Sequence, residues 1–432
     1  MTASAAAGRV AVVDRESPRG VTVTVDLDAI RANLVAARRL SNGGKVFAVV
    51  KADAYGHGAI PVATALSRCD MPAESRADGF AVVTTAEALA LRAARIDRPI
   101  LVLQGPLDAA DATLSAEAGL WPVIHDVEQH AWYRDWCRTR AAERTGGRAG
   151  ERAAAGAAGR AASGGPADAS RSAPDAWLKV DTGMGRLGVR PDAVGRLLGA
   201  DDAIRWRGVL SHLACADEPG SEHARGQIDA FAALDVPRGL ARSLANSAAV
   251  LAWPDACHDW ARPGLMLYGC DPLIATPRED GMPRATLRPA MRVTTTLLSV
   301  KVMEAGQGVG YAQTWRCSER MRVGLARVGY ADGLPRVLDE RARVRIGGAD
   351  CPIVGRVSMD SIALDLRAAP QARIGDEVEL WGATLAVDAL ADAAGTIAYE
   401  LLTGIRGRRR LVDVPSTDER EEGPDISVSR QP

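Results

Sequence analysis

Residues 79–103 read GFAVVTTAEALALRAARIDRPILVL and divide into three parts. Two apolar runs, Gly79–Val83 and Pro99–Leu103, flank Thr85–Arg95, in which alanine, leucine and arginine repeat over a helical length. Short apolar runs joined by amphipathic segments of this kind are typical of strand–helix–strand units with parallel strands. The sequence therefore predicts one such unit here.

Similar runs recur on both sides of this unit, eight in all, and most gaps between them have helical patterns. The runs are Val46–Lys51, Gly79–Val83, Pro99–Leu103, Trp121–Ile124, Trp177–Asp181, Trp206–Ser211, Ala241–Asn246 and Gly264–Tyr268. Eight units predict a (β/α)8 barrel, which typically has ~250 residues. An open doubly wound sheet is the alternative. It is disfavoured because no run is followed by a glycine-rich dinucleotide-binding or phosphate-binding loop.

The pattern changes after about residue 282, where apolar and polar residues alternate between turns rich in glycine, proline and aspartate. Such alternation predicts an antiparallel β domain over residues 283–414, after a barrel domain over 20–282. Val21–Leu27 also alternates, and this segment is a candidate strand that pairs with the β domain. The other expected strands are Val293–Val302, Arg322–Val328, Ala342–Ile346, Ile353–Val357, Ser361–Leu366 and Glu377–Trp381.

Three segments lack the residues needed for a core. Residues 1–19 and 415–432 are polar and are predicted to be disordered tails. Residues 141–175 contain no Val, Ile, Leu, Phe, Met, Trp or Tyr. A segment of this composition cannot bury enough apolar area to offset the entropy of ordering it. It is predicted to be a solvated insertion between the fourth and fifth barrel strands.

Composition excludes several classes of function. The 432 residues include 53 basic and 54 acidic side chains, a net charge of -1, so no charge excess favours nucleic acid or an acidic membrane. No apolar run approaches the ~20 residues of a membrane span, and no secretory signal is recognisable. The seven cysteines are scattered, and the histidines lack metal-ligand spacing. We expect a cytoplasmic protein with reduced thiols and no metal.

Lys51 closes the first apolar run, at the strand end where barrel enzymes carry their chemistry. Partial burial lowers the pKa of a lysine and suits it to form a Schiff base. The alternative is a strand-end lysine whose stem covers apolar surface. The run by itself leaves both interpretations open.

The residues after Lys51 extend the pattern to KADAYGHG, residues 51–58, which resembles the pyridoxal-phosphate (PLP) signature of the alanine racemases. Further motifs of that family follow in order, and together they cover about Gly20–Val414 outside the insertion. The resemblance implies a PLP-binding barrel followed by a C-terminal β domain. The motifs are WLKVDTGMGRLG (177–188), LSHLACADE (210–218), NSAA (246–249), RPGL (262–265), VGY (309–311), VGYADG (328–333), CPIVGRVSMD (351–360) and GTIAYE (395–400).

The resemblance implies a two-base racemase. Lys51 would bind PLP covalently and act on one face of the substrate Cα, and Tyr311 would be the base on the other face. A free tyrosine has a pKa of ~10, so Tyr311 needs cationic or hydrogen-bonding neighbours. His212 and Arg262 match that network in the family. From the strand pattern alone, a core residue of the β domain is the preferred interpretation of Tyr311.

The remaining site residues are carried over in the same way. Arg262 matches the residue that faces the pyridine nitrogen, and an arginine keeps its proton, so the ring nitrogen should stay largely unprotonated. Arg186 and the Met359 N–H match groups that bind the substrate carboxylate, and Arg186 also reaches the phenolic oxygen. Lys179 matches a lysine that some relatives carbamylate, or it is a polar strand residue. The phosphate cradle would comprise Tyr55, Ser247, Tyr399 and the N–H groups of Gly264 and Leu265.

The resemblance also implies a homodimer whose active sites are shared between subunits. The expected reaction is the interconversion of L- and D-alanine, which supplies D-alanine for peptidoglycan. A serine or broad-specificity racemase, a basic amino-acid decarboxylase and a non-catalytic PLP carrier are alternatives, and Tyr311 argues against the last two. An access corridor would exclude side chains much larger than methyl; its residues match Asp217, Tyr330, Arg356 and Tyr399. Ser358 stands where many relatives have cysteine.

Overall fold

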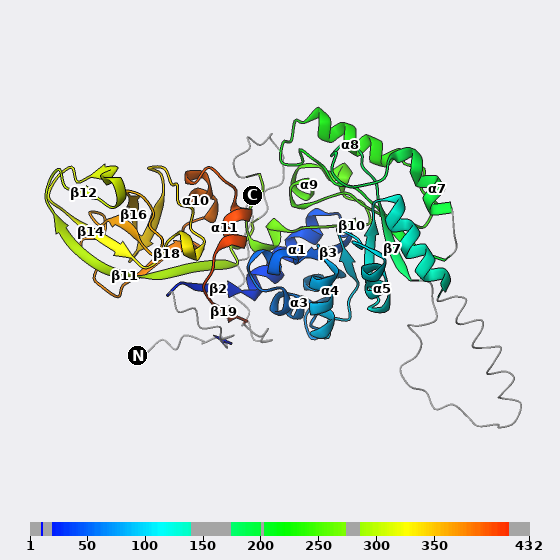
Figure 1. Ribbon diagram of the computed structural model, residues 1–432, viewed down its shortest axis with the longest axis horizontal. Helices are drawn as coiled ribbons and strands as arrows, with labels where there is room; N and C mark the ends of the chain where they lie inside the picture. The colour runs from blue at the N-terminus through cyan, green and yellow to red at the C-terminus, as the bar shows by residue number, and fades with distance from the viewer. Residues whose placement is uncertain (1–9, 12–19, 140–173, 200–202, 274–285, 414–432) are drawn as a thin grey trace, which may run out of the picture.

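The computed structural model describes residues 10–11, 20–139, 174–199, 203–273 and 286–413. Figure 1 shows two bodies side by side: a barrel surrounded by helices, and a domain built mainly of strands. The long strand β11 (Met291–Met303) runs from the junction to the far end of the second body. The predicted boundary between the two domains, at residues 282–283, lies outside the described residues.

Eight parallel strands form the barrel, in the order β10-β3-β4-β5-β6-β7-β8-β9. The two outer strands meet, because the Arg262 N–H donates to the Ala245 carbonyl (2.9 Å) and Ser243 Oγ donates to the Trp260 carbonyl (2.8 Å). The predicted barrel is therefore confirmed. The strands are β3 (Lys45–Val49), β4 (Gly79–Val82), β5 (Ile100–Val102), β6 (Trp121–Ile124), β7 (Asp175–Lys179), β8 (Arg205–Leu210), β9 (Ala241–Ser243) and β10 (Trp260–Ala261).

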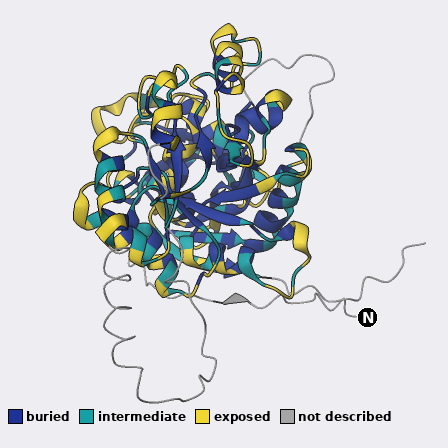
Figure 2. Ribbon diagram, turned by 90° about the vertical axis from the view of Figure 1, so that its right-hand side faces the viewer, coloured by how far each residue is buried: buried dark blue, intermediate teal, exposed yellow. Residues whose placement is uncertain are grey.

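Helices follow most strands and cover the outside of the barrel (Figure 2). Residues 127–139 are also helical. Within the described ranges, no helix is long and apolar enough to cross a membrane. The helices are α1 (Leu27–Leu40), α2 (Lys51–Tyr55), α3 (Ala59–Ser67), α4 (Thr85–Ala93), α5 (Ala109–Glu117), α7 (Val194–Gly199), α8 (Glu222–Ala232) and α9 (Ser247–Ala252).

The eighth strand is not where the sequence predicted it. The expected run Gly264–Tyr268 forms a 3₁₀ helix, η5 (Leu265–Tyr268), and the strand is the short β10 just before it. All four residues of η5 are buried. A continuous apolar run carries no periodicity that separates a buried strand from a buried helical turn, so the run was assigned wrongly.

Aromatic side chains fill the barrel at the end where its strands begin. Phe47 stacks on Trp260 at 3.9 Å between ring centroids and makes edge contacts with Trp121 and Trp177. Phe47 and Trp177 are fully buried. This packing closes one end of the barrel and leaves the opposite end, where the strands finish, for a cavity.

The second domain is a predominantly antiparallel sheet in the order β1-β19-β2-β11-β14-β17-β16-β15-β18. The long strand β11 also pairs with β18, so the sheet curls back on itself. Two helices, α10 (Val387–Ala393) and α11 (Ala398–Gly404), complete the domain. The remaining strands are β1 (Val10–Ala11), β2 (Thr22–Asp26), β12 (Gly308–Val309), β13 (Trp315–Arg316), β14 (Met321–Ala326), β15 (Arg343–Ile346), β16 (Ala349–Val354), β17 (Ile362–Asp365), β18 (Glu377–Trp381) and β19 (Arg408–Val412).

The first and last parts of the chain meet in this sheet. The strand expected at Val21–Leu27 is β2, which pairs antiparallel with β11 and parallel with β19. Within the tail expected at residues 1–19, Val10–Ala11 forms strand β1 and pairs with β19, because this short apolar stretch can extend the sheet edge. The rest of residues 1–19 and the tail at 415–432 lie outside the described residues.

Most of the expected insertion, residues 141–173, also lies outside the described residues. Its predicted end at Asp175 is too late, because Asp175 opens strand β7. The Asp175 carboxylate accepts hydrogen bonds from the guanidinium groups of Arg205 and Arg207 on the neighbouring strand β8. An acidic residue thus begins a strand here because two arginines beside it neutralise its charge.

Candidate active site

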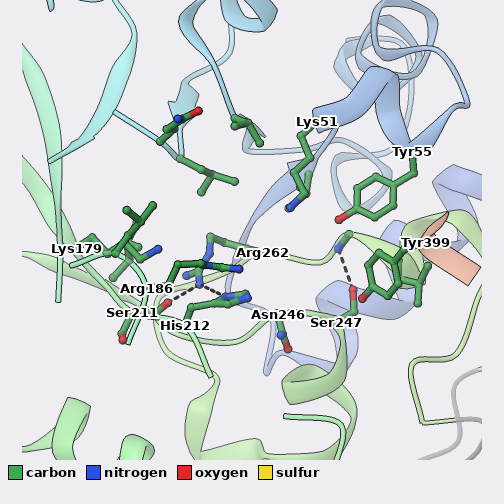
Figure 3. Close-up of a pocket in the computed structure, with 18 residues that line it drawn as sticks. Lys51, Tyr55, Lys179, Arg186, Ser211, His212, Asn246, Ser247, Arg262 and Tyr399 are labelled. Atoms are coloured by element: carbon green, nitrogen blue, oxygen red, sulfur yellow. Dashed lines mark hydrogen bonds between the residues drawn. The ribbon is translucent and has the colours of Figure 1, made fainter. Parts of the chain in front are cut away.

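A cavity of about 360 Å³ opens where the barrel strands end (Figure 3). Its walls come from residues at or just after the ends of β3, β4, β5, β7, β8, β9 and β10, with Tyr399 from α11. Nine of the predicted site residues line it together: Lys51, Tyr55, Arg186, His212, Ser247, Arg262, Gly264, Leu265 and Tyr399. Residues that are far apart in the sequence are therefore brought to one place.

Lys51 lies just after β3, and the chain beyond it is held by Glu87. The Ala52 N–H donates to Glu87 Oε1 (2.8 Å), while Glu87 Oε2 accepts from the Val83 N–H (2.7 Å) at the end of β4. Burial lowers the pKa of Lys51, and the charge of Arg186 lowers it further, while Glu87 acts in the opposite direction. The lowered pKa increases the fraction of neutral amine, which is the form that acts as a nucleophile or base.

The four residues Ala52–Tyr55 form a left-handed turn, with φ between 51° and 54°. None is glycine, and a left-handed conformation costs free energy at every residue that has a Cβ. Asp53 ties the turn to its surroundings. Its Oδ2 pairs with Arg409 of β19 (2.8 Å), and its Oδ1 accepts from the Ala59 N–H at the start of α3 (2.7 Å). The turn directs the Tyr55 side chain into the cavity.

Tyr55, Ser247 and Tyr399 gather at one end of the cavity (Figure 3). Ser247 Oγ accepts from the N–H groups of Gly264 (2.9 Å) and Met266 (3.3 Å), so its own hydrogen is available to a ligand. In this state the Gly264 N–H donates to Ser247 rather than into the cavity. A Cβ at Gly264 would lie 2.3 Å from Tyr55 Oη, so only glycine fits beside that hydroxyl.

Arg262 lies between the two ends of the cavity and is almost completely buried. Its Nη1 donates to Ser243 Oγ, and its Nη2 to the Ser211 carbonyl, both at 2.6 Å. Nη2 also lies 3.5 Å from His212 Nδ1. Because an arginine only donates, His212 Nδ1 is the acceptor and its proton sits on Nε2. Burial and the Arg262 charge lower the pKa of His212 to about 3, which keeps the imidazole neutral.

The charge of the cavity is strongly positive. Lys51, Lys179, Arg186 and Arg262 line it, and none of the lining residues in the described part of the chain is acidic. Burial lowers the pKa of Lys179 to about 8, with further lowering by Arg262 and Arg186. Arg262 stays protonated at neutral pH, although burial lowers its pKa to about 10. Such a cavity suits a ligand with several negative charges, such as a phosphate ester together with a carboxylate.

Tyr311 and Met359 are not brought to this cavity. Tyr311 is 71% exposed and Met359 is 52% exposed. Tyr311 follows β12, which Figure 1 places at the end of the β domain farthest from the barrel. Met359 lies beside another exposed tyrosine, since its carbonyl accepts from the N–H of Ala331, the residue after Tyr330. These side chains therefore do not meet Lys51 within one chain.

Sequence reasoning missed several lining residues. Val83, Leu103, Ser211 and Asn246 are the last residues of predicted apolar runs. Because a barrel site is built from strand ends, these positions could have been identified from the run boundaries alone. Gln104 carries no comparable signal. The remaining missed residues are Val49, Leu187 and Leu210.

Comparison with known proteins identifies the family of this chain. Residues 25–272 match the model of the alanine racemase N-terminal domain, and residues 290–412 match that of the C-terminal domain. The chain belongs to the alanine racemase family. The alanine racemase of Azoarcus sp. (strain BH72) is 40% identical over 393 residues, which cover 90% of this chain and 98% of the relative. The biosynthetic alanine racemase of Pseudomonas aeruginosa is 39% identical over 394 residues.

Solved structures of alanine racemases share the whole architecture. The biosynthetic enzyme from Pseudomonas aeruginosa matches with a TM-score of 0.74 at 38% identity, covering 91% of this chain and 99% of that one. The enzyme from Bartonella henselae, solved with covalently bound pyridoxal phosphate, matches at 0.74 and 27% identity, covering 91% and 99%. The predicted recognition, fold and enzyme class are confirmed: the chain is an enzyme with alanine racemase activity.

Proposed function

We propose that this enzyme racemises alanine with PLP bound covalently to Lys51, and that it supplies D-alanine for peptidoglycan. The observation that carries the proposal is a partly buried lysine with a lowered pKa that lines a cationic cavity. The residues present fit PLP. Tyr55, Ser247 and the chain at Gly264–Leu265 would hold the phosphate. The lack of a side chain at Gly264 supports this, because a Cβ there would displace the Tyr55 hydroxyl.

The other contacts of the cofactor follow from the same orientation. Arg262, near the middle of the cavity, would hold the pyridine nitrogen, and Arg186 would hold the phenolic oxygen and the substrate carboxylate. When bound, PLP supplies an electron sink that makes the Cα–H bond of the amino acid more acidic. Arg262 stays charged at neutral pH, so it would donate to the ring nitrogen without transferring its proton.

The proton transfers fall to two side chains. Lys51 removes or returns the proton on one face of Cα, and its lowered pKa increases the fraction of free base near neutral pH. Tyr311 serves the opposite face. Two bases are needed because a single base tends to return the proton to the face from which it came. His212 and Arg262 lie next to each other and would complete the network that activates Tyr311.

We infer that Tyr311 comes from a second copy of the chain. Tyr311 and Met359 are exposed, and the tip of the β domain that carries Tyr311 lies far from its own barrel. In a two-fold symmetric homodimer, each β domain would cover the partner's barrel mouth, and two equivalent sites would form. Each site would take Lys51, Arg186 and Arg262 from one chain and Tyr311 and Met359 from the other.

Complementation tests the shared site. Homodimers of Lys51→Ala and of Tyr311→Phe should each lose nearly all racemase activity. In their heterodimer one site carries both changes and the other carries neither, so about half the native activity should return. Heterodimers purified through two different tags, and assayed by chiral chromatography of L-alanine, measure this directly.

The matched control pairs Lys51→Ala with Lys51→Arg, because that heterodimer has a damaged lysine in both sites and should stay inactive. An inactive Lys51→Ala/Tyr311→Phe heterodimer would mean that both bases come from one chain. The same assay with L-serine and L-lysine tests the preference for a methyl side chain. Rapid racemisation of either would contradict the proposed specificity for alanine.

A further inference from the structure

We propose that His57 is a positioning residue, which holds the left-handed turn Ala52–Tyr55 through its Nδ1–H and so fixes the Tyr55 hydroxyl at the phosphate end of the cavity. The inference rests on the proposed function, since it assumes that Tyr55 binds the PLP phosphate. His57 itself does not line the cavity. It lies behind the turn and is completely buried.

The contacts of His57 define its protonation state. Nδ1 lies 3.0 Å from the Ala54 carbonyl and 3.0 Å from the Tyr55 carbonyl. Both partners only accept, so Nδ1 must carry a hydrogen. Nε2 is buried and has no hydrogen-bond partner among the described residues. A second proton on Nε2 would therefore be left without an acceptor, and the ring is neutral.

Electrostatics around the ring agree with this assignment. Burial, the dominant cause, lowers the pKa of His57 to about 4. The carbonyls of Tyr55 and Ala54 act in the opposite direction, as does Asp53, while Arg409 lowers the pKa further. His57 is thus a fixed donor near neutral pH rather than a titrating group.

The turn needs such a donor because its backbone is unfavourable. Four consecutive residues other than glycine have positive φ, and only Asp53 is of a type that adopts this conformation readily. On the outer side, Asp53 holds the turn through Arg409 and the Ala59 N–H. On the inner side, His57 bridges the last two carbonyls of the turn. The Ala54 carbonyl accepts from the His57 N–H as well (3.0 Å).

A row of aromatic rings connects His57 to the cavity. The imidazole stacks on Tyr268 at 4.4 Å between centroids, and the Tyr268 ring lies 4.8 Å from that of Tyr55. Tyr268 is fixed in turn, since its hydroxyl donates to the Val49 carbonyl at the end of β3 (2.7 Å). The closeness of Gly264 to Tyr55 Oη leaves the hydroxyl little freedom. A small relaxation of the turn therefore displaces this hydroxyl directly.

Two amide substitutions distinguish a positioning role of His57 from a general contribution to the stability of the fold. The side-chain N–H of asparagine can occupy the place of His57 Nδ1, whereas the longer glutamine places its amide near Nε2. His57→Asn and His57→Gln are thus matched in polarity and differ in where the donor lies. The readout is binding of PLP and of pyridoxal, which lacks the phosphate, to each apoenzyme. Circular dichroism checks that each variant is folded.

We expect His57→Gln to weaken PLP binding about tenfold, the effect of one lost hydrogen bond, and His57→Asn to stay near the wild type. Pyridoxal binding should be nearly equal in all three proteins. In a Tyr55→Phe background, His57→Gln should cause little further loss for PLP, because both changes act on one hydroxyl.

Equal PLP affinity in the two variants would overturn the role of His57, and so would equal losses for PLP and pyridoxal. The proposed function fails separately, if the wild-type apoenzyme does not bind PLP or binds it no better than pyridoxal. If the wild type binds PLP better than pyridoxal and His57→Gln keeps the same preference, only the positioning role is contradicted.

Discussion

Replacing Gly264 by alanine tests the proposed phosphate site most directly. The φ of Gly264 is −119°, so the glycine is not required here by a left-handed backbone. The Cβ of alanine, however, would lie 2.3 Å from Tyr55 Oη and 3.0 Å from Tyr55 Cζ. Ordinary contact begins near 3.4 Å, so the hydroxyl and the backbone must separate by about 1 Å.

Neither partner moves easily. The Tyr55 ring is packed against Tyr268 and Tyr399, and the Gly264 N–H is bonded to Ser247 Oγ. Overpacking of this size costs about 1–3 kcal/mol. If the cost falls on the bound state, the dissociation constant for PLP should rise about 10–100-fold, since 1.4 kcal/mol is a factor of ten.

Spectrophotometric titration of the apoenzyme with PLP measures the change. Gly226→Ala is the control, because Gly226 lies in α8 and a Cβ there meets nothing within 4 Å. That variant should bind PLP as the wild type does. Unchanged PLP affinity in Gly264→Ala would refute the reasoning, since it would mean that the phosphate does not depend on the contact between Gly264 and Tyr55.

Three further outcomes are expected. The pKa of Lys179 is about 8, so much of its amine is neutral at pH 8 and should react with CO2 to form a carbamate. NMR of the protein in labelled bicarbonate should show the carbamate signal. The signal should be absent from Lys179→Ala and should weaken below pH 8. The pKa of His57 is about 4 when folded and near its ordinary 6.5 when unfolded, so its contribution to stability is complete above pH 6.5 and falls as pH drops toward 4. Urea unfolding of the apoenzyme should show about 2 kcal/mol of this loss between pH 7.5 and 5, which His57→Asn lacks. Deletion of residues 141–172 should preserve activity, whereas a deletion that extends through Asp175 should lower the thermal midpoint, because Arg205 and Arg207 lose their shared partner.

The barrel was largely predictable because parallel strands are buried on both faces and appear as apolar runs. Seven of the eight runs are strands, among them Gly79–Val83 and Pro99–Leu103. The error at Gly264–Tyr268 has a physical cause, since a buried 3₁₀ turn and a buried strand require the same apolar residues. The short β10 has only two residues, too few for a pattern to show.

The site was predictable where its residues belong to sequence motifs. The left-handed turn at Ala52–Tyr55 was not, because no glycine marks the positive φ values and the turn is held by the distant Arg409 and by His57. The family resemblance predicted Tyr311 as a catalytic base in a site shared between subunits, but the strand pattern alone could not place it. A motif specifies that a residue is used, and only the fold shows that Tyr311 lies far from its own barrel.

The pairing of β2 with β19 has a consequence for synthesis of the chain. Strand β2 leaves the ribosome before the barrel, while its partners β11 and β19 follow after the barrel is complete. Until β19 arrives, one edge of β2 has no partner, and an open edge invites association with other chains. A chain that stops short of residue 408 would hold an intact barrel but an unfinished sheet. Strand β19 thus covers an edge that β2 leaves open from early in synthesis, and aggregation or proteolysis can distinguish a product without β19 from one that contains it.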